Sequence, residues 1–109
     1  MRVELTEMLW FEEHSITLSE LSELCALPLP LMEELVGGGV IAPLPSTGAE
    51  ARFGAQALNA ARTARRLRED FDLDASGLML ALGLIERVQD LEREIRALRA
   101  RLPRSLNPK

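Results

Sequence analysis

The sequence predicts a mainly α-helical fold that carries a small β wing and ends in a long C-terminal helix. Three observations lead to this prediction. A capped helix and a second short helix fit within residues 18–36. Two short apolar stretches flank a proline-containing loop between residues 40 and 53, and one helical pattern runs without a break over residues 75–102. Aromatic residues make up only 4% of the chain while Leu, Ala and Arg are abundant, and that composition favours helix.

The first predicted helix begins at Leu18. Thr17 is followed three residues later by Glu20, which is the spacing of a capping box. The buried face of this helix is expected to hold Leu18, Leu21, Leu24 and Cys25, and its solvent face Ser19, Glu20, Ser22 and Glu23. Residues 2–11 mix apolar side chains with glutamates, and there we expect an edge strand or an irregular segment.

A second helix is expected after Pro28, because Pro30 suits the first turn of a helix. Its buried face is expected to hold Leu31, Met32, Leu35 and Val36, with Glu33 and Glu34 exposed. Three consecutive glycines, residues 37–39, end the helix, since glycine adopts the left-handed conformation of a helix C-terminus without strain. Helix, tight turn and short helix together have the size of a helix-turn-helix.

The next segments predict a wing and a third helix. Residues 40–41 and 51–53 are expected to form two short strands around the proline-containing loop. The third helix is expected from Ala55 to Glu69, with its inward face made by Leu58, Ala61, Ala64 and Leu67 and extended by Phe71. Arg65 and Arg66 are spaced to pair with Glu69 and Asp70 one turn later.

Asp74 is expected to cap a final helix that runs from Ala75 to Leu102 and stops at Pro103. Apolar residues in this helix alternate steps of four and three, as in a coiled coil: Leu84, Val88, Leu91, Ile95, Leu98 and Leu102. This stripe predicts a homodimer interface, and the charged residues beside it suit a parallel pair of helices. The orientation stays open, and the arm could instead fold back onto its own domain.

We expect residues 1–54 (N-terminal segment, helix-turn-helix and wing) and residues 55–109 (basic helix and long C-terminal helix) to pack as one domain. The longest apolar stretch, residues 78–85, is too short to span a bilayer, and no secretory signal is visible, so a cytoplasmic protein without a membrane segment is expected. Cys25 is the only cysteine and His14 the only histidine. We therefore expect no metal site, no cofactor, no catalytic residues and no enzymatic activity.

Charge is distributed unevenly along the chain. Residues 1–50 carry one basic and nine acidic groups, a net of −8, whereas residues 51–109 carry twelve basic and eight acidic groups, a net of +4. The front half should attract a basic partner and repel phosphate. A row of arginines in the third helix could be a nucleic-acid patch, but no aromatic residues are interleaved with it, which favours a solvated helix face: Arg62, Arg65, Arg66 and Arg68.

Two resemblances follow from these residues. Residues 18–43, followed by Arg52 and Phe53, resemble the winged helix-turn-helix of MerR-type regulators. The longer stretch from Ile16 to Leu102 is similar to the CbpM family of chaperone modulators, with the most specific matches in LDASGLMLAL (residues 73–82), LEREIRALRARL (residues 91–102) and VGGGVIAP (residues 36–43). The segment from Trp10 to Ser15 is partly additional to that family.

The CbpM resemblance implies a partner. Such proteins bind the J-domain of a DnaJ-type curved-DNA-binding co-chaperone, prevent it from engaging DnaK, lower its DNA binding and act as dimers without a catalytic site. A J-domain carries a basic helix, so the partner-binding face is expected on the acidic helices, with an apolar anchor at Leu29 or Leu31. The acidic members of that face are Glu20, Glu23, Glu33 and Glu34. The alternative is that these carboxylates are only a solvated helix exterior.

The rival function is DNA binding by a MerR-like transcriptional regulator. In that family two arginines at the start of the second helix hold phosphates and base edges. Pro30 and Glu33 occupy the corresponding positions here, and only Arg52 in the predicted wing could contact a DNA backbone. Because Lys and Arg supply most of the affinity of a protein for phosphate, these residues argue against nucleic acid as the partner.

Overall fold

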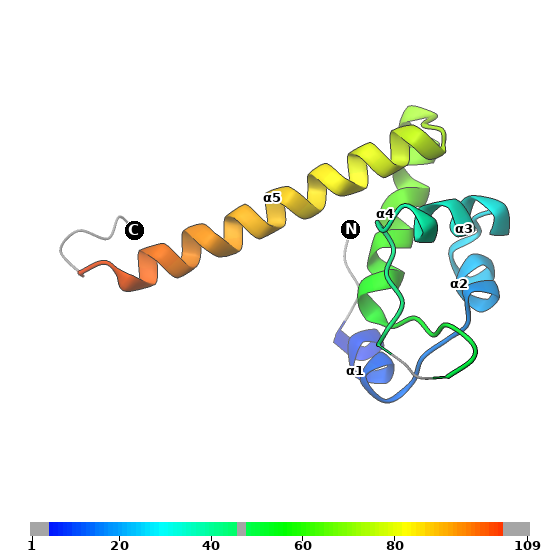
Figure 1. The fold of residues 1–109 in the computed structure, drawn as a ribbon, viewed down its shortest axis with the longest axis horizontal. Helices are drawn as coiled ribbons and strands as arrows, with labels where there is room; N and C mark the ends of the chain where they lie inside the picture. The colour runs from blue at the N-terminus through cyan, green and yellow to red at the C-terminus, as the bar shows by residue number, and fades with distance from the viewer. Residues whose placement is uncertain (1–4, 46–47, 104–109) are drawn as a thin grey trace.

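The computed structural model describes residues 5–45 and 48–103, which form five helices and no strand. The helices are α1 (Leu5–Glu13), α2 (Leu18–Cys25), α3 (Leu29–Gly37), α4 (Ala55–Phe71) and α5 (Ala75–Arg101). α4 is central and packs against α1, α2 and α5, while α3 packs against α2 and α5. Figure 1 shows that α5 then leaves the globular part and projects far beyond it. The predicted mainly α class, with its long C-terminal helix, is confirmed.

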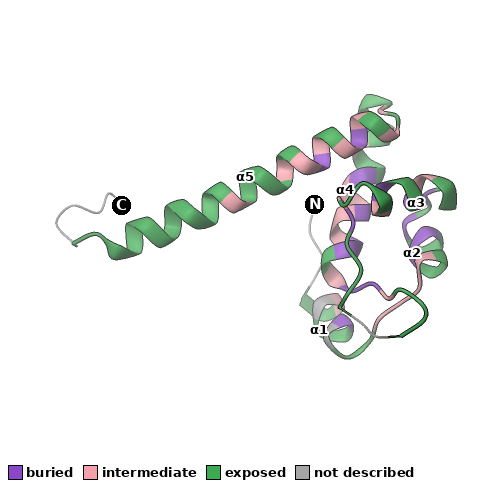
Figure 2. Ribbon diagram, in the orientation of Figure 1, coloured by how far each residue is buried: buried purple, intermediate pink, exposed green. Residues whose placement is uncertain are grey.

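The core lies where α2, α3 and α4 meet the beginning of α5. Its largest fully buried side chains include Phe53, Leu21, Met32, Leu35, Ile41, Leu58 and Leu78. Only the first two turns of α5 contribute to this core, through Leu78 and Leu82. Figure 2 shows the change along α5, from buried and half-buried residues beside the globular part to exposed residues in the projecting part.

α2 begins as predicted, but its inward face is rotated from the expected one. Both hydrogen bonds of the Thr17–Glu20 capping box are present. Ser22, expected to be exposed, is buried and donates its hydroxyl hydrogen bond to the Leu27 carbonyl. Leu24, expected to be buried, is 52% exposed. The reason is geometric: Leu18, Leu21, Ser22 and Cys25 follow the i, i+3, i+4, i+7 pattern of one helix face, and Leu24 lies outside it.

The exit from α3 depends on two of its three glycines. Gly39 adopts φ +81°, in the left-handed region that favours glycine. Gly38 packs against α5, and a Cβ atom at this position would lie 2.3 Å from the Met79 sulfur. The predicted end of the helix at the glycine run is therefore confirmed. Residues of the same run also bring α3 close to the start of α5.

The predicted pair of wing strands is wrong for the part of the segment that the structure describes. The Val40 and Ile41 N–H groups both donate to the Leu35 carbonyl, at 3.2 and 3.4 Å, so they complete the end of α3 instead of a sheet. Phe53 forms an isolated antiparallel bridge with Ile16. Across the loop, the Leu44 N–H donates to the Arg52 carbonyl at 2.8 Å. Residues 46 and 47 of the predicted loop lie outside the described residues.

The N-terminal segment also differs from the prediction, since residues 5–13 form α1 instead of an edge strand. Two side chains one turn apart attach this helix to the domain. Phe11 is buried in the core, and Glu7 forms an ion pair with Arg62 of α4. Residues 2–4 of the predicted strand lie outside the described part of the chain.

α4 and α5 begin where the sequence predicts. α4 extends two residues beyond Glu69, and Phe71 at its end is 68% exposed, so the expectation that it extends the inward face is wrong. Asp72 follows in the left-handed conformation (φ +54°), which turns the chain. The predicted cap of α5 is confirmed: the Asp74 carboxylate accepts a hydrogen bond from the Gly77 N–H at 2.9 Å. With 27 residues, α5 is roughly 40 Å long.

Candidate protein-binding faces

The four predicted acidic residues lie on the solvent faces of two helices that pack against each other. Glu20 and Glu23 are exposed on α2, and Glu33 and Glu34 are exposed on α3. None of the four forms an ion pair with any residue of the described ranges 5–45 and 48–103. The chain holds no Lys or Arg between Arg2 and Arg52 to offset their charge. The structure therefore places these carboxylates on neighbouring helices, open to solvent, and we call them the acidic face.

Glu20 differs from the other three because its carboxylate also caps α2. It accepts a hydrogen bond from the Thr17 N–H at 2.8 Å, and the Thr17 hydroxyl accepts one from the Glu20 N–H at 3.2 Å. The hydrogen bond from the Thr17 backbone, then that from its side chain, and more weakly the charge of Arg52, lower the pKa of Glu20 below its ordinary value. This carboxylate thus stays ionised but is partly committed to holding the helix start.

The two predicted anchors are not equivalent. Leu29 is 37% exposed in the first turn of α3, and Glu33 lies one helical turn later on the same side. Leu31 is half-buried and packs against the core. Of the two predicted anchors, Leu29 is therefore the one accessible to a partner, whereas Leu31 mainly packs α3 against the core.

Leu24 is a candidate contact that the sequence analysis misplaced. It is exposed on α2, one turn after Glu20 and adjacent in sequence to Glu23. The helical spacing alone did not decide its position, because Ser22 and Leu24 lie at about equal angles on either side of the direction of Leu21 and Cys25. The solvent side of α2 therefore carries an aliphatic side chain among its carboxylates.

The predicted dimer stripe lies on the projecting part of α5. Its members are between 40% and 59% exposed: Leu84, Val88, Leu91, Ile95, Leu98 and Leu102. They contact no other element of the described structure that would bury them, so the arm does not fold back onto its own domain. Within the single chain Arg87 pairs with Glu94 of the same helix at 3.8 Å. An exposed apolar stripe of this kind is a candidate interaction surface.

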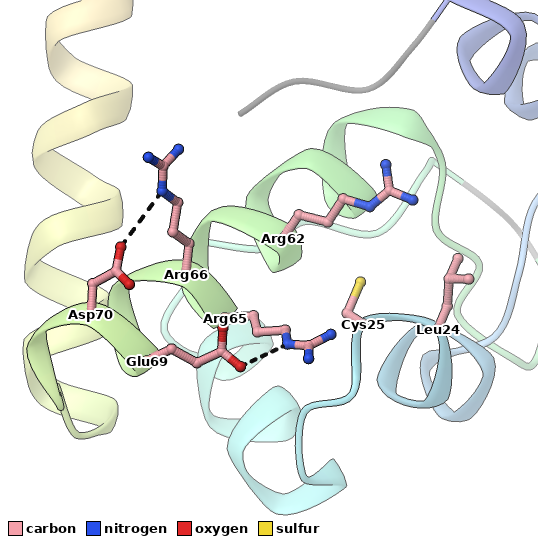
Figure 3. Close-up of a pocket in the computed structure, with 7 residues that line it drawn as sticks. All are labelled: Leu24, Cys25, Arg62, Arg65, Arg66, Glu69 and Asp70. Carbon is pink, nitrogen blue, oxygen red and sulfur yellow. Dashed lines mark hydrogen bonds and ion pairs between the residues drawn. The ribbon is translucent and has the colours of Figure 1, made fainter.

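Three of the four arginines of α4 pair with nearby carboxylates. Arg65 and Arg66 pair with Glu69 and Asp70 at 3.2 and 3.6 Å, as predicted (Figure 3). Arg62 forms two hydrogen bonds of 2.7 Å with the two carboxylate oxygens of Glu7. These pairs agree with a solvated helix face more than with a free phosphate-binding row.

Arg52, the one basic residue near the predicted DNA-reading helix, is also engaged. Its guanidinium donates to the Ser15 hydroxyl at 3.0 Å and to the Ser15 carbonyl at 2.6 Å. These bonds tie the segment before α2 to the segment before α4, beside the Ile16–Phe53 bridge. A structural role therefore accounts for this arginine.

The remaining reactive side chains are in inert surroundings. Cys25 is buried, and desolvation raises the pKa of its thiol above the ordinary value despite the charges of Arg62 and Arg65. His14 stacks on Trp10 with a ring-centroid distance of 4.2 Å.

In the described part of the chain no three His, Cys, Asp or Glu side chains converge as a metal site would require. Nor is any described helix both long and apolar enough to cross a membrane.

Comparison with known proteins agrees with this architecture. Residues 16–100 match the family model of the MerR HTH family regulatory proteins. The chain is 38% identical over 76 residues to proteins named chaperone modulatory protein CbpM from Salmonella paratyphi B, Salmonella newport and Salmonella heidelberg. Each alignment covers 70% of this chain and 75% of the relative.

The fold and the comparison define the class of the protein as a regulator with a MerR-type helix-turn-helix domain. The chain belongs, within that class, to the CbpM family of chaperone modulatory proteins. α1 lies before residue 16 and is therefore outside the part that matches the family model.

Proposed function

We propose that this protein is a non-enzymatic modulator that binds the J-domain of a DnaJ-type curved-DNA-binding co-chaperone and covers the surface through which that domain engages DnaK. Membership of the CbpM family supports a partner from a chaperone system. The observation that carries the proposal is the acidic face, where the DNA-reading arginines of a MerR-type helix are replaced and the four exposed carboxylates form no ion pair with a described residue. A basic helix of the J-domain is the complementary partner.

Charge and apolar contact have separate roles in this mechanism. Complementary charge mainly raises the association rate and selects the partner. Affinity depends on a few well-buried contacts. Leu29, exposed at the start of α3 with Glu33 one turn away, is the anchor we propose, and Glu23, Glu33 and Glu34 provide the surrounding charge. Steric coverage of the J-domain then prevents it from reaching DnaK.

We propose further that two chains associate through the stripe on α5. A stripe that alternates steps of four and three residues fits side-by-side helix packing, and it is exposed in the single chain. A dimer would carry two acidic faces, one on each globular part. The DNA-binding alternative has less support, because Glu33 lies exposed where a phosphate would approach and Arg52 is engaged with Ser15.

Calorimetric titration tests the proposal directly. The chain is titrated into the isolated J-domain of the same organism's curved-DNA-binding co-chaperone, at low and at moderate salt. We expect saturable binding of one J-domain per chain that weakens as salt rises. Absence of binding at tens of micromolar would refute the proposal.

Matched variants locate the interface. Glu33→Lys/Glu34→Lys and Leu29→Ser should each weaken binding at least tenfold. Glu13→Lys/Glu50→Lys changes the net charge by the same amount at exposed positions away from the acidic face, and it should leave binding close to that of the wild type. Equal losses in both charge variants would mean that net charge, and not this face, determines the interaction.

A further inference from the structure

The last two turns of α5 carry a cationic surface at the far end of the arm. Residues 95–103 contain three arginines and no carboxylate. All three are exposed, and none forms an ion pair with a residue of the described ranges 5–45 and 48–103, whereas Arg87 and Arg93 earlier in the helix do. We propose that this surface binds the acidic face of a second copy of the chain. We call it the arm tip, and its members are Arg96, Leu98, Arg99, Arg101 and Leu102.

The arm tip combines charge with aliphatic surface. Leu98 and Leu102 lie one helical turn apart, and both are exposed. Since an α-helix has about 3.6 residues per turn, Arg99 lies on one side of the two leucines and Arg101 on the other. One side of the helix therefore presents two leucines between two guanidinium groups. Arg96 adds a third positive charge one turn before Arg99.

The acidic face has the complementary composition. Its four carboxylates form no ion pair with a described residue. Leu24 on α2 and Leu29 on α3 are exposed among them. A helix that carries leucines between arginines can thus contact carboxylates and leucines at the same time. Opposite charge selects the partner and raises the association rate, and contact between the leucines contributes affinity.

The arm tip cannot reach the acidic face of its own chain. α5 is one unbroken helix of 27 residues, and Leu82 is the last of its residues that is buried in the core. The later turns project away from the globular part, so the arm tip lies at the opposite end of the molecule from α2 and α3 (Figure 1). A contact between the arm tip and the acidic face therefore joins two chains.

Two other roles account for only part of this surface. Arg99 and Arg101 lie in the last turn of α5, where a positive charge favours the negative end of the helix dipole. That role needs no partner and leaves the leucines exposed. A nucleic acid would use the arginines for its phosphates, but it would leave the leucines unused, and α5 has no aromatic side chain on which a base could stack. The acidic face matches the charges and the leucines together.

This contact competes with two other interactions. Leu98 and Leu102 also belong to the stripe of the proposed arm dimer, so an arm tip bound to an acidic face is not paired with another arm. An acidic face covered by an arm tip is closed to a J-domain. That second consequence rests on the proposed function, whereas the contact between copies does not. The chain therefore carries a competitor for its own binding face, and its occupancy should rise with protein concentration.

Two complementary variants of the full chain test the contact. The face variant carries Glu33→Lys/Glu34→Lys, and the tip variant carries Arg96→Glu/Arg99→Glu. Both also carry Val88→Ser, which interrupts the stripe and so weakens arm pairing. Neither variant alone retains an arm tip and an acidic face of opposite net charge, whereas a mixture of the two contains one unaltered arm tip and one unaltered acidic face. The mixture should form a one-to-one pair, with a dissociation constant at least about tenfold lower than for self-association of either variant.

Sedimentation velocity of each variant and of the equimolar mixture measures this difference. Arm pairing through the stripe would not make the mixture stronger than the face variant alone, because the charged residues beside the stripe are unaltered in the face variant. A mixture that associates no more strongly than the face variant would overturn the proposal and leave the arm tip to a different acidic partner.

A matched control assigns the effect to the arm tip. Arg87→Glu/Arg93→Glu makes the same change of charge on α5 outside the arm tip. A chain that carries it together with Val88→Ser should self-associate as the Val88→Ser chain does. Loss of association in this control, equal to that in the tip variant, would refute the site. No J-domain is present in these measurements, so this proposal and the proposed function can fail independently.

Discussion

The globular part and the projecting arm of α5 use the same kinds of apolar side chain in opposite ways. In the globular part Leu58 and Leu78 are fully buried in the core that also holds Phe53. In the arm the six residues of the stripe from Leu84 to Leu102 remain 40–59% exposed. The change falls just after Leu82, the last buried residue of α5. The domain thus completes its core within its own chain, whereas the stripe of the arm stays exposed in the single chain, where we propose that a second copy covers it.

The largest expected effect separates the two regions with one type of substitution. Leu58→Ala should lower the free energy of unfolding by about 3 kcal/mol, because it opens a cavity in a fully buried site. Leu98→Ala removes the same atoms from the exposed stripe. It should leave the unfolding of a dilute, monomeric sample almost unchanged. Urea denaturation at several protein concentrations measures both.

The dependence on protein concentration is the informative control. The loss for Leu58→Ala should be the same at every concentration, whereas the loss for Leu98→Ala should grow as the wild type becomes dimeric. A large loss for Leu98→Ala in dilute solution would show that the arm is part of the domain core.

The next effect concerns the arm alone. Leu91→Glu/Ile95→Glu places two carboxylates in the middle of the stripe, and we expect the dimer dissociation constant to rise roughly a hundredfold because a charge is costly to bury. Sedimentation velocity gives the mass in solution. Glu92→Gln/Gln89→Glu, which changes only residues beside the stripe, serves as the control. A wild-type protein that sediments as a monomer at all concentrations would contradict the proposed arm interface.

A smaller effect tests how α1 is attached to the globular part. Glu7→Gln removes the charge from the bidentate pair with Arg62, in which both side chains are about one third exposed, and should cost about 1.5 kcal/mol. Trp10, the only tryptophan, lies on α1 and reports its local environment by fluorescence. Glu13→Gln on the same helix is the matched control. Unchanged stability in Glu7→Gln would mean that the charge of Glu7 does not help to hold α1.

The smallest effect concerns the start of α2. Thr17→Ala removes one half of the capping box and should cost about 1 kcal/mol in thermal or urea unfolding. A loss as small as that of an exposed surface substitution elsewhere, such as Ser19→Ala, would show that the cap contributes nothing.

The same cap predicts a dependence on pH. The pKa of Glu20 is lower in the folded chain than in the unfolded chain, so its contribution is present above the ordinary glutamate pKa and is lost as the pH falls through the lowered pKa of the folded chain. Glu20→Gln keeps the hydrogen-bonding geometry without the charge. The stability of this variant should decline less steeply in acid than that of the wild type.

Local rules predicted the helix boundaries well. The Thr17–Glu20 box, the Asp74 cap and the glycine run after α3 each act through neighbouring backbone groups, and all three are where the sequence places them. The i,i+4 pairs of α4 were predictable for the same reason. The position of the stripe on α5 followed from its periodicity, whereas the partner that covers it remains a proposal.

Features that depend on distant residues could not be predicted in this way. α1 is helical where it contacts α4, through Glu7 and Phe11, and no local signal in residues 5–13 indicated that contact. The predicted wing strands do not form in the described residues, because the N–H groups of Val40 and Ile41 donate to a carbonyl of α3 and Phe53 pairs with Ile16. Leu24 is exposed and Ser22 is buried because α2 is rotated slightly from the predicted orientation. This rotation moves Leu24 from the core to the surface that holds the candidate site.

The central claim is that the acidic face occludes a J-domain, and the direct measurement is the steady-state ATP hydrolysis of DnaK stimulated by the co-chaperone. Increasing amounts of this protein should reduce the rate to that of DnaK alone. Glu33→Lys/Glu34→Lys should restore most of the stimulation, and Glu13→Lys/Glu50→Lys should inhibit like the wild type. Stimulation that persists while the J-domain is saturated with this protein would contradict the account.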